Sequence, residues 1–355
     1  MNICKNASDA FINVIEVISD EGEYISTRGN DQKEILSYLL KIENPKERVI
    51  ILKRRNNNIF ALIAETMWVL GGRDDLQYLS RYLPRAIDFS DDGLVWRAAY
   101  GPRLRNWDGV DQFKNIARII NEDHNTKRAV MTIFNPKLDY VETKDVPCNN
   151  WLHFIERNGE LNLNVCVRAN DAVWGFGGIN SFEWSTLLEM MANWTGNKIG
   201  TLSWFVGSFH VYSRHYKTVE NILKENNGKT VYDYGISSPK FTLPIDCFDE
   251  EMNKWFELEE KIRTVKDKSN IYLVDDLKDD LMKESMKMLY IYNLYLNNGS
   301  KEDIIDLLEE METSDFKMGA LEYFYRIYGY GSIKLNEIEK SFFDDYFENI
   351  SKERE

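Results

Sequence analysis

The sequence predicts an α+β fold followed by an all-helical extension. In residues 1–250, helical and strand-like segments are mixed without the regular alternation that a parallel βαβ sheet requires. In residues 251–355 the periodicity is helical, and 25 acidic side chains stand against 15 basic ones. We therefore expect one domain at 1–250, with helices packed on a sheet, and an acidic helical extension at 251–355.

The elements of the first domain follow from residue spacing. Residues 59–70 are almost wholly apolar and end at Gly71-Gly72, which is a helix-stop signal. Residues 161–167 alternate apolar with polar or small side chains, as a strand does. By the same criteria we expect helices at 59–70, 111–121 and 182–194, and strands at 128–134, 161–167 and 201–212.

The extension carries its own helix signals. One helix ends at Asn297-Asn298-Gly299, and Ser300 with Asp303 resembles a capping box for the next helix. Two more helices are expected at 315–328 and 334–348. Packing or oligomerisation is the simplest role for such a module, and regulation or partner binding is the alternative.

Composition excludes several classes of protein. The 355 residues are 43% hydrophobic, which is enough for a sizeable core, and the net charge of −14 repels nucleic acid and anionic membranes. No run of 18 apolar residues occurs, and the first 25 residues carry several charges, so we expect a cytoplasmic protein without a membrane span or signal peptide. Its four cysteines and four histidines lack zinc-site spacing, and we expect no metal site and no DNA partner.

Cys148 is the best candidate for a nucleophile. It follows Pro147 and precedes a strand. A thiol attacks as its thiolate, which needs positive charge nearby. Arg128 and Arg168 stand at the ends of expected strands, and guanidinium groups can stabilise a thiolate and grip a phosphate. The pattern suggests a phosphate-bearing substrate; a cysteine hydrolase would need a histidine base, for which His153 is poorly placed.

These residues belong to a set of motifs that resembles the thymidylate synthase family, which includes the deoxycytidylate and cytidylate hydroxymethylases. The resemblance covers residues 25–215, in order and with similar spacings. The matching segments are Arg28, Glu65 to Gly72, Tyr100-Gly101, Lys127-Arg128, Pro147-Cys148-Asn149, Arg168-Ala169-Asn170-Asp171, Asn180 and His210-Val211-Tyr212. Each motif is weak alone, but their common order identifies 1–250 as a catalytic domain similar to this family.

The resemblance implies a role for each matched residue. Cys148 would add to C6 of a pyrimidine ring, Tyr100 would help to remove the C5 proton, and Glu65 would organise a proton relay near O4. Asp171 would help to position the cofactor, 5,10-methylenetetrahydrofolate. The residues implied to bind the pyrimidine nucleoside monophosphate are Arg28, Lys127, Arg128 and Arg168 at the phosphate, Asn180 at the base, and His210 and Tyr212 at the sugar hydroxyl. The paired basic residues of the family come from a second subunit, which implies a homodimer with shared sites.

Two departures from the family pattern bear on the product. The segment Ile87-Asp88-Phe89 lacks the tryptophan that packs over the transferred carbon in methylating members. The chain also continues into acidic helices where those members end in a short apolar segment. Both changes would admit water and favour a hydroxymethyl product over a methyl one, and the sequence leaves both products open.

The sequence also leaves alternatives for the base of the substrate and for whether the protein is catalytic. Asn180 favours uracil, so a uridylate such as dUMP is the expected substrate, and dCMP or CMP hydroxymethylation is the alternative. Asn149 stands where the family has histidine, and Ala169 where it has serine. These substitutions motivate an alternative of another class, a non-catalytic nucleotide-binding or scaffold relative.

Overall fold

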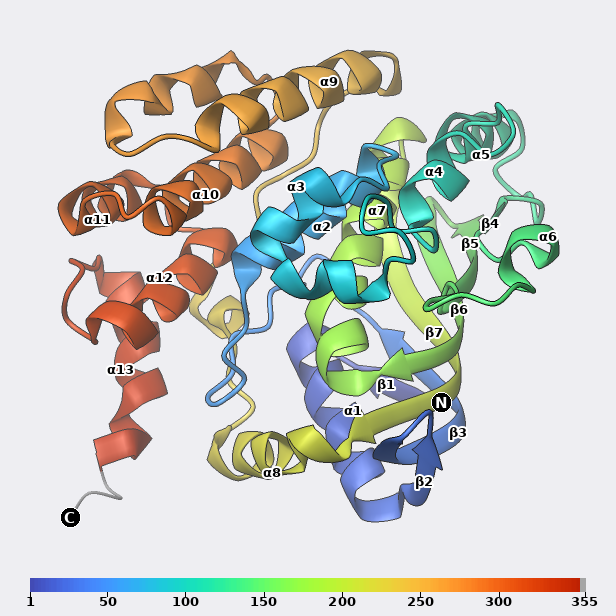
Figure 1. Cartoon of the computed structure of the whole chain (residues 1–355), viewed down its shortest axis with the longest axis horizontal. Coiled ribbons are helices and arrows are strands. Elements are labelled where there is room, and N and C mark those ends of the chain that lie inside the picture. Colours follow the sequence, from blue (N-terminus) through green and yellow to red (C-terminus); the bar gives the residue numbers. More distant parts are fainter. Residues whose placement is uncertain (352–355) are drawn as a thin grey trace. The chain divides into compact units, whose positions relative to one another are not determined.

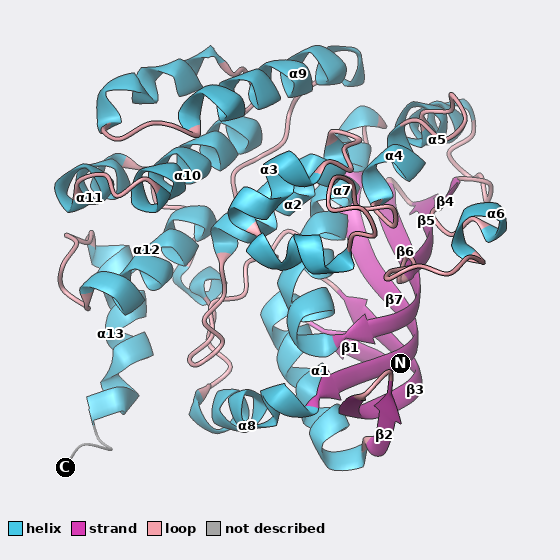
Figure 2. Ribbon diagram, viewed as in Figure 1, coloured by secondary structure: helices cyan, strands magenta, loops and turns pink. Residues whose placement is uncertain are grey.

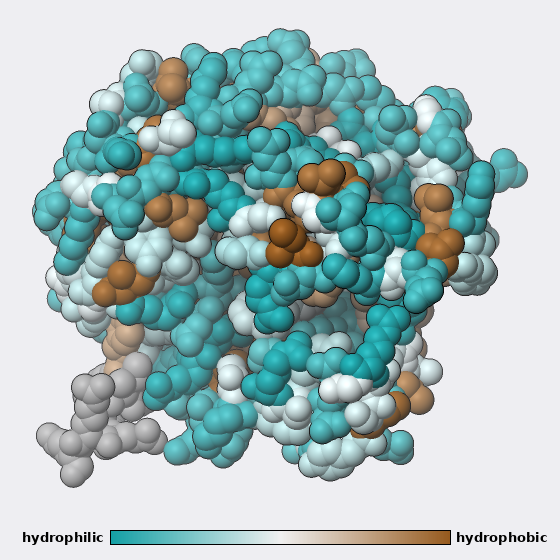
Figure 3. All heavy atoms as spheres, in the orientation of Figure 1, coloured by the Kyte–Doolittle hydropathy of each residue, from teal (hydrophilic) through white to brown (hydrophobic). Residues whose placement is uncertain are grey.

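The computed structural model of the chain describes residues 1–351 (Figure 1). Two compact units are present. The first consists of Met1–Arg48, Ala61–Tyr216 and Pro244–Asp246, and the second of Val49–Phe60, Lys217–Leu243 and the chain from Cys247 onward. No helix in residues 1–351 has both the length and the apolar character needed to cross a membrane. On the face drawn in Figure 3 the surface is mostly hydrophilic, with small separate hydrophobic patches.

A mixed sheet organises the first unit (Figure 2). Its strand order within the described residues is β1-β3-β7-β6-β5-β4, and β2 pairs with β3 outside that path. The β1–β3 and β6–β7 pairs are parallel and the others are antiparallel. The strands are β1 (Asn2–Cys4), β2 (Glu23–Thr27), β3 (Asn30–Ile42), β4 (Val130–Thr132), β5 (Asn149–Arg157), β6 (Glu160–Asp171) and β7 (Lys198–Tyr212).

Helices α1 and α7 pack against one face of this sheet (Figure 2). The helices that begin before residue 217 are α1 (Ala7–Glu21), α2 (Ile59–Leu70), α3 (Leu76–Tyr82), α4 (Tyr100–Arg105), α5 (Gln112–Glu122), α6 (Pro136–Asp139), α7 (Ser181–Trp194), α8 (Tyr216–Glu225) and the short η1 (Pro84–Phe89), η2 (Ala172–Asn180) and η3 (Ser213–His215). On β7, Leu202, Trp204 and Val206 are buried. Because successive strand residues point to opposite faces, Phe205 lies on the other face, where it is 41% exposed.

The second face carries a row of apolar side chains that crosses four strands. Leu39 pairs with Phe205, Phe205 with Cys166, and Cys166 with Trp151. The Trp151 and Phe205 rings lie 6.3 Å apart, and Leu39 is 41% exposed. We call these four residues the outer row. A groove of about 320 Å³ opens along the same face.

The second unit is helical. Its remaining elements are η4 (Val231–Tyr234), α9 (Ile245–Ile262), η5 (Lys268–Asp276), α10 (Asp280–Leu296), α11 (Lys301–Glu310), α12 (Asp315–Tyr328) and α13 (Glu337–Ser351). Stacked aromatic rings such as Phe60 and Tyr292, 4.6 Å apart, form its core. Ser300 caps α11 by accepting the backbone N–H of Asp303 at 3.0 Å, as expected.

The predicted α+β class with a helical C-terminal region is confirmed. The helices expected at 59–70 and 315–328 are α2 and α12, whereas the strand expected at 128–134 shortens to β4. The compact helical unit also takes in residues 49–60 and 217–243. A catalytic domain at 1–250 with a functional boundary to 251–355 stays a prediction.

Candidate active site

Cys148 lies at the entrance to β5, directly beside Arg168 of β6. The backbone N–H of Arg168 donates to the Cys148 carbonyl at 2.9 Å, which aligns the two strands. The Arg168 guanidinium donates to the carbonyls of Pro147 (3.0 Å) and Val146 (2.7 Å), and it lies 3.7 Å from Cys148 Sγ. Arg168 therefore holds the backbone around the sulfur and also supplies positive charge to it.

The Cys148 thiol is half-buried, and its pKa reflects opposing influences. Burial is the largest and raises this pKa to about 11; Asp145 and Asp171 act in the same direction, whereas Arg168 and Arg28 oppose it. The isolated chain therefore keeps Cys148 protonated near neutral pH. Arg168 and Arg28 favour the thiolate form of Cys148 against the effect of burial.

Asp145 places a negative charge beside this thiol. Its carboxylate accepts the indole N–H of Trp96 at 2.8 Å, and the Trp96 ring stacks on Phe89 with centroids 5.1 Å apart. Burial raises the pKa of Asp145, and the Trp96 hydrogen bond and the charge of Arg168 oppose that change. A tryptophan therefore does stand in this neighbourhood, with its N–H engaged by Asp145, although residues 87–89 contain none.

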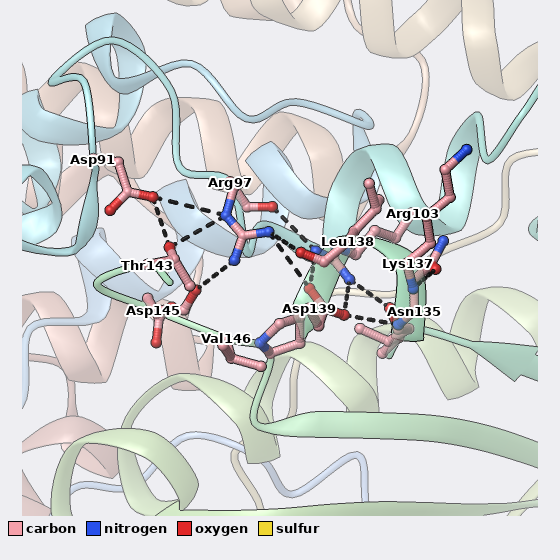
Figure 4. Close-up of polar contacts among 12 residues, drawn as sticks. Asp91, Arg97, Arg103, Asn135, Lys137, Leu138, Asp139, Thr143, Asp145 and Val146 are labelled. Atoms are coloured by element: carbon pink, nitrogen blue, oxygen red, sulfur yellow. Dashed lines mark hydrogen bonds and ion pairs between the residues drawn. The ribbon is translucent and has the colours of Figure 1, made fainter. Parts of the chain in front are cut away.

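The loop that leads to Cys148 is held by two further arginines (Figure 4). Arg103 donates to both carboxylate oxygens of Asp139, at 2.7 and 2.8 Å. Arg97 donates to the Asp145 carbonyl at 3.1 Å and lies 3.8 Å from the Asp139 carboxylate. Burial raises the pKa of Asp139, but the hydrogen bonds and charge of Arg103 outweigh it and leave that pKa below its ordinary value. These contacts hold the segment of chain that leads to Cys148.

Asn149, which stands where the family has histidine, links two aromatic residues. Its amide donates to the Tyr100 hydroxyl at 2.8 Å and accepts the indole N–H of Trp184 at 3.1 Å. Asn149 and Trp184 are fully buried. Because the Tyr100 oxygen accepts from Asn149, its own proton is directed elsewhere and can reach a ligand. Burial, followed by the charges of Cys148 and Glu183, raises the pKa of Tyr100 well above its ordinary value.

Glu65 and Glu183 bring two carboxyl groups to the same region. Burial raises the pKa of Glu65 to about 8. Burial and then the charge of Glu65 raise the pKa of Glu183 well above its ordinary value. The Asn180 amide donates to Glu183 at 3.4 Å. Glu65 and Asn180 were expected at the site from the sequence, whereas Glu183 was not. The sequence signal that could have identified Glu183 is an acidic residue within an otherwise apolar helix, and Glu65 shows the same signal.

Asp171, His210 and Tyr212 lie at the neighbouring ends of β6 and β7. Asp171 and His210 are register partners on β6 and β7, and the rings of His210 and Tyr212 lie 5.0 Å apart. Burial is the largest influence on the pKa of His210 and lowers it, while the charge of Asp171 opposes this change. Burial raises the pKa of Tyr212, and the charge of Asp171 raises it further. Arg28, in the turn between β2 and β3, opposes the shift at Tyr212.

The structure thus brings together most of the expected site residues. The Cys148 cluster consists of Arg28, Tyr100, Cys148, Arg168, Asp171, His210 and Tyr212, with Glu65 and Asn180 joined to it through Glu183. Lys127 and Arg128 are not part of it. Both are exposed beside β4, and no described contact joins either side chain to the cluster.

Known proteins resemble this chain along most of its length. A family model described as thymidylate synthase matches residues 9–249. A deoxyuridylate hydroxymethyltransferase of Bacillus phage SP01 is 30% identical over 352 aligned residues, covering 90% of this chain and 91% of the relative. One of Delftia phage PhiW-14 is 28% identical, covering 82% and 87%. A thymidylate synthase of Vesicomyosocius okutanii is 23% identical, covering 59% and 81%.

A mixed sheet thus brings a thiol against a guanidinium, with buried carboxyl and phenol groups around them, and the relatives that match along most of the chain are named as transferases. The chain belongs to the thymidylate synthase family, whose enzymes transfer a one-carbon unit to C5 of pyrimidine nucleotides.

Proposed function

We propose that this enzyme transfers a one-carbon unit from 5,10-methylenetetrahydrofolate to C5 of dUMP and releases 5-hydroxymethyl-dUMP. The observation that carries the proposal is the half-buried thiol of Cys148, 3.7 Å from the Arg168 guanidinium. Similarity to phage deoxyuridylate hydroxymethyltransferases along 90% and 82% of the chain supports the substrate and the product.

The nucleophile acts on the ring. Cys148 Sγ bonds to C6 and gives up its proton, which makes C5 electron-rich. Arg168 lowers the cost of the thiolate, because its positive charge opposes the effect of burial on the Cys148 pKa. Tyr100, whose oxygen accepts from Asn149, moves the C5 proton toward water when the new carbon–carbon bond has formed.

Separate residues bind the phosphate, the base and the sugar of the nucleotide. Arg28 and Arg168 attract the 5′-phosphate, since both place positive charge at the Cys148 cluster. Asn180 pairs with uracil through its amide, which can donate to O4 and accept from N3. His210 and Tyr212 bond the sugar hydroxyl through their ring nitrogen and phenol groups.

The residues around Asp171 fit the folate cofactor. A pterin ring offers N–H donors to a carboxylate and a flat face to an aromatic side chain. Asp171 supplies the carboxylate, and Trp174, three residues later and 48% exposed, supplies an aromatic surface. When bound, the cofactor provides the transferred carbon at the oxidation level of formaldehyde. Asp171 and Trp174 would orient it.

The hydroxymethyl product follows from access of water. Ile87 and Phe89 are 50% and 43% exposed, so the segment without a tryptophan stays open to solvent. Water then takes the place of tetrahydrofolate on the transferred carbon before a hydride can arrive, and the bond between Cys148 Sγ and C6 breaks to restore the pyrimidine ring. The match to the thymidylate synthase model ends at residue 249, whereas similarity to the SP01 enzyme covers 90% of the chain. We propose that 1–250 carry the catalytic groups and that 251–355 form an extension shared with the hydroxymethyltransferases.

A homodimer would complete the phosphate site. Lys127 and Arg128 are exposed and have no described contact with the Cys148 cluster, so they are free to reach a second subunit. The outer row offers an apolar face for such a subunit. Inactive Cys148→Ala and Arg128→Ala enzymes, when mixed and exchanged, should regain activity at about a quarter of their sites. No recovery, with dimers present in ultracentrifugation, contradicts shared sites.

Tritium release tests the reaction itself. The enzyme is incubated with methylenetetrahydrofolate and dUMP, UMP, dCMP or CMP tritiated at C5. We expect release from dUMP, a product heavier by one CH₂O group, and no rise in dihydrofolate absorbance; Cys148→Ala should be inactive. Dihydrofolate with a methylated product contradicts the hydroxymethyl assignment, and release only from a cytidylate contradicts the base assignment. No release from any nucleotide contradicts the proposed function.

A further inference from the structure

The short helices η2 and η3 leave the sheet at the same end. Strands β6 and β7 are parallel, and Asp171 pairs in register with His210 near their carboxyl ends. The chain enters η2 directly after β6 and η3 directly after β7. Because parallel neighbours finish at the same end of a sheet, residues of these two short helices can meet although they lie far apart in the sequence. Trp174 of η2 and His215 of η3 do so.

Trp174 and His215 are joined through their polar atoms. The indole N–H of Trp174 donates to Nε2 of His215 at 3.1 Å, and the two ring centroids lie 6.1 Å apart in an edge-on arrangement. Trp174 is 48% exposed, so packing covers only part of its ring. Since an indole nitrogen can only donate, this acceptor selects the orientation of the ring in which the N–H points at η3.

The same nitrogen of His215 also accepts a hydrogen bond from Arg214, whose Nε–H lies 3.2 Å away. A nitrogen that accepts hydrogen bonds must keep its lone pair, so His215 is the neutral tautomer with its proton on Nδ1. The Arg214 guanidinium in turn lies over the Tyr212 ring, 4.2 Å from the ring centroid. The contacts therefore run from the end of β7 through η3 to the exposed tryptophan of η2.

We propose that His215 is a positioning residue that holds the Trp174 indole in one orientation for the pterin ring of the cofactor. This inference rests on the proposed function, in which Trp174 supplies an aromatic surface to the cofactor. A side chain that must become ordered when a ligand binds lowers the affinity, whereas one that is already ordered does not. His215 thus acts on the cofactor through Trp174 and need not touch it.

Two substitutions of His215 separate the hydrogen bond from the bulk of the ring. His215→Gln carries an amide oxygen at the ε position, so it can still accept the indole N–H. His215→Phe keeps a flat ring beside Trp174 but has no acceptor. The control repeats His215→Phe in a Trp174→Phe background, which has no indole N–H to be held. Rates are compared per folded enzyme, with the folded fraction taken from circular dichroism.

The kinetic effect should fall on the cofactor. We expect His215→Phe to raise the KM for methylenetetrahydrofolate about three- to tenfold, which corresponds to ordering one side chain on binding. The KM for dUMP should stay within about twofold of the parent value, and His215→Gln should keep both values within about twofold. In the Trp174→Phe background, His215→Phe should change neither KM by more than about twofold.

Nuclear magnetic resonance tests the contact without the reaction. In enzyme labelled with heavy nitrogen at tryptophan, the indole signal that Trp174→Phe removes belongs to Trp174. This signal should move upfield in His215→Phe, because the N–H loses its acceptor, and it should stay near the parent position in His215→Gln.

Several results would overturn the inference. These are a Trp174 signal that does not move in His215→Phe, a His215→Gln enzyme as poor as His215→Phe, and a KM for dUMP that rises as much as the KM for the cofactor. A full effect of His215→Phe in the Trp174→Phe background also overturns it, because His215 would then act without the indole. An inactive parent enzyme whose Trp174 signal moves as expected refutes the proposed function and leaves the hold of His215 on Trp174 supported.

Discussion

Replacing Asn149 with alanine removes the link between Trp184 and Tyr100. Trp184 is fully buried, so its indole N–H would lose the only acceptor that the described chain offers it, at 3.1 Å. An unpaired buried donor costs about 1–3 kcal/mol, and the lost bond to Tyr100 adds about 0.5–1.5 kcal/mol. We therefore expect the free energy of unfolding to fall by about 2–4 kcal/mol.

Activity should suffer for a separate reason. The Tyr100 oxygen accepts from Asn149 at 2.8 Å, which leaves the phenol proton for the ligand. Without that contact the hydroxyl turns freely, and we expect kcat to fall about 10-fold or more, within the range for a general acid or base. Asn149→Asp sharpens the test, because a carboxylate would accept the phenol proton and reverse the bond. The aspartate variant should lose at least as much activity as the alanine variant.

Urea unfolding followed by tryptophan fluorescence measures the first effect, and tritium release from dUMP measures the second. Asn164, a partly exposed asparagine on β6, provides the control: Asn164→Ala should change unfolding by less than about 0.5 kcal/mol. If Asn149→Ala unfolds within about 0.5 kcal/mol of the parent and keeps its rate, the reasoning about this link is wrong.

Three further outcomes follow from the same contacts. Because burial raises the pKa of Cys148 to about 11, its alkylation by iodoacetamide should accelerate about tenfold per pH unit from pH 7 to 10. Peptide mapping measures the rate, with the exposed Cys247 as internal reference, and a plateau in the Cys148 rate below pH 9 would contradict this. In the Arg168→Lys variant, a single ammonium group cannot contact the carbonyls of Val146 and Pro147 and the Cys148 sulfur together, so the KM for dUMP should rise about 10-fold or more and Cys148 alkylation should slow. An unchanged KM with an unchanged alkylation rate would refute the role of Arg168 in both substrate binding and thiolate stabilisation. Arg103 depresses the pKa of Asp139, so the pair stabilises the fold above the ordinary carboxyl pKa and loses that contribution as pH falls through the lowered one. Asp139→Asn should cost about 3–5 kcal/mol at pH 7 and progressively less as the pH falls below the ordinary carboxyl pKa; a cost independent of pH would argue against the pair.

Local patterns predicted the elements whose ends carry strong signals. Helix α2 stops at paired glycines, and α11 starts at the Ser300 cap, so both could be identified from short windows of sequence. The hairpin of β2 and β3 could not, because all residues of β2 are exposed and lack an apolar alternation. The inclusion of residues 49–60 in the helical unit depends on contacts such as Phe60 with Tyr292, which no local window contains.

The candidate site was predictable where strand pairing enforces it. Cys148 and Arg168 meet because β5 and β6 are antiparallel neighbours, and the spacing of their motifs reflects that register. Glu183 was not predicted because part of its raised pKa comes from the charge of Glu65, which lies on a different helix. Asp145 was not predicted for a similar reason, since Trp96, which donates a hydrogen bond to it, lies 49 positions away in the chain.

The central claim is that Cys148 bonds to C6 of dUMP, and a trapped adduct tests it most directly. With 5-fluoro-dUMP and methylenetetrahydrofolate, fluorine cannot leave C5 as a proton does, so the covalent complex should accumulate. Mass spectrometry should find nucleotide and cofactor together on the peptide that contains Cys148, and no adduct on Cys148→Ala. An adduct on another residue, or no adduct in an enzyme that releases tritium, would contradict the account.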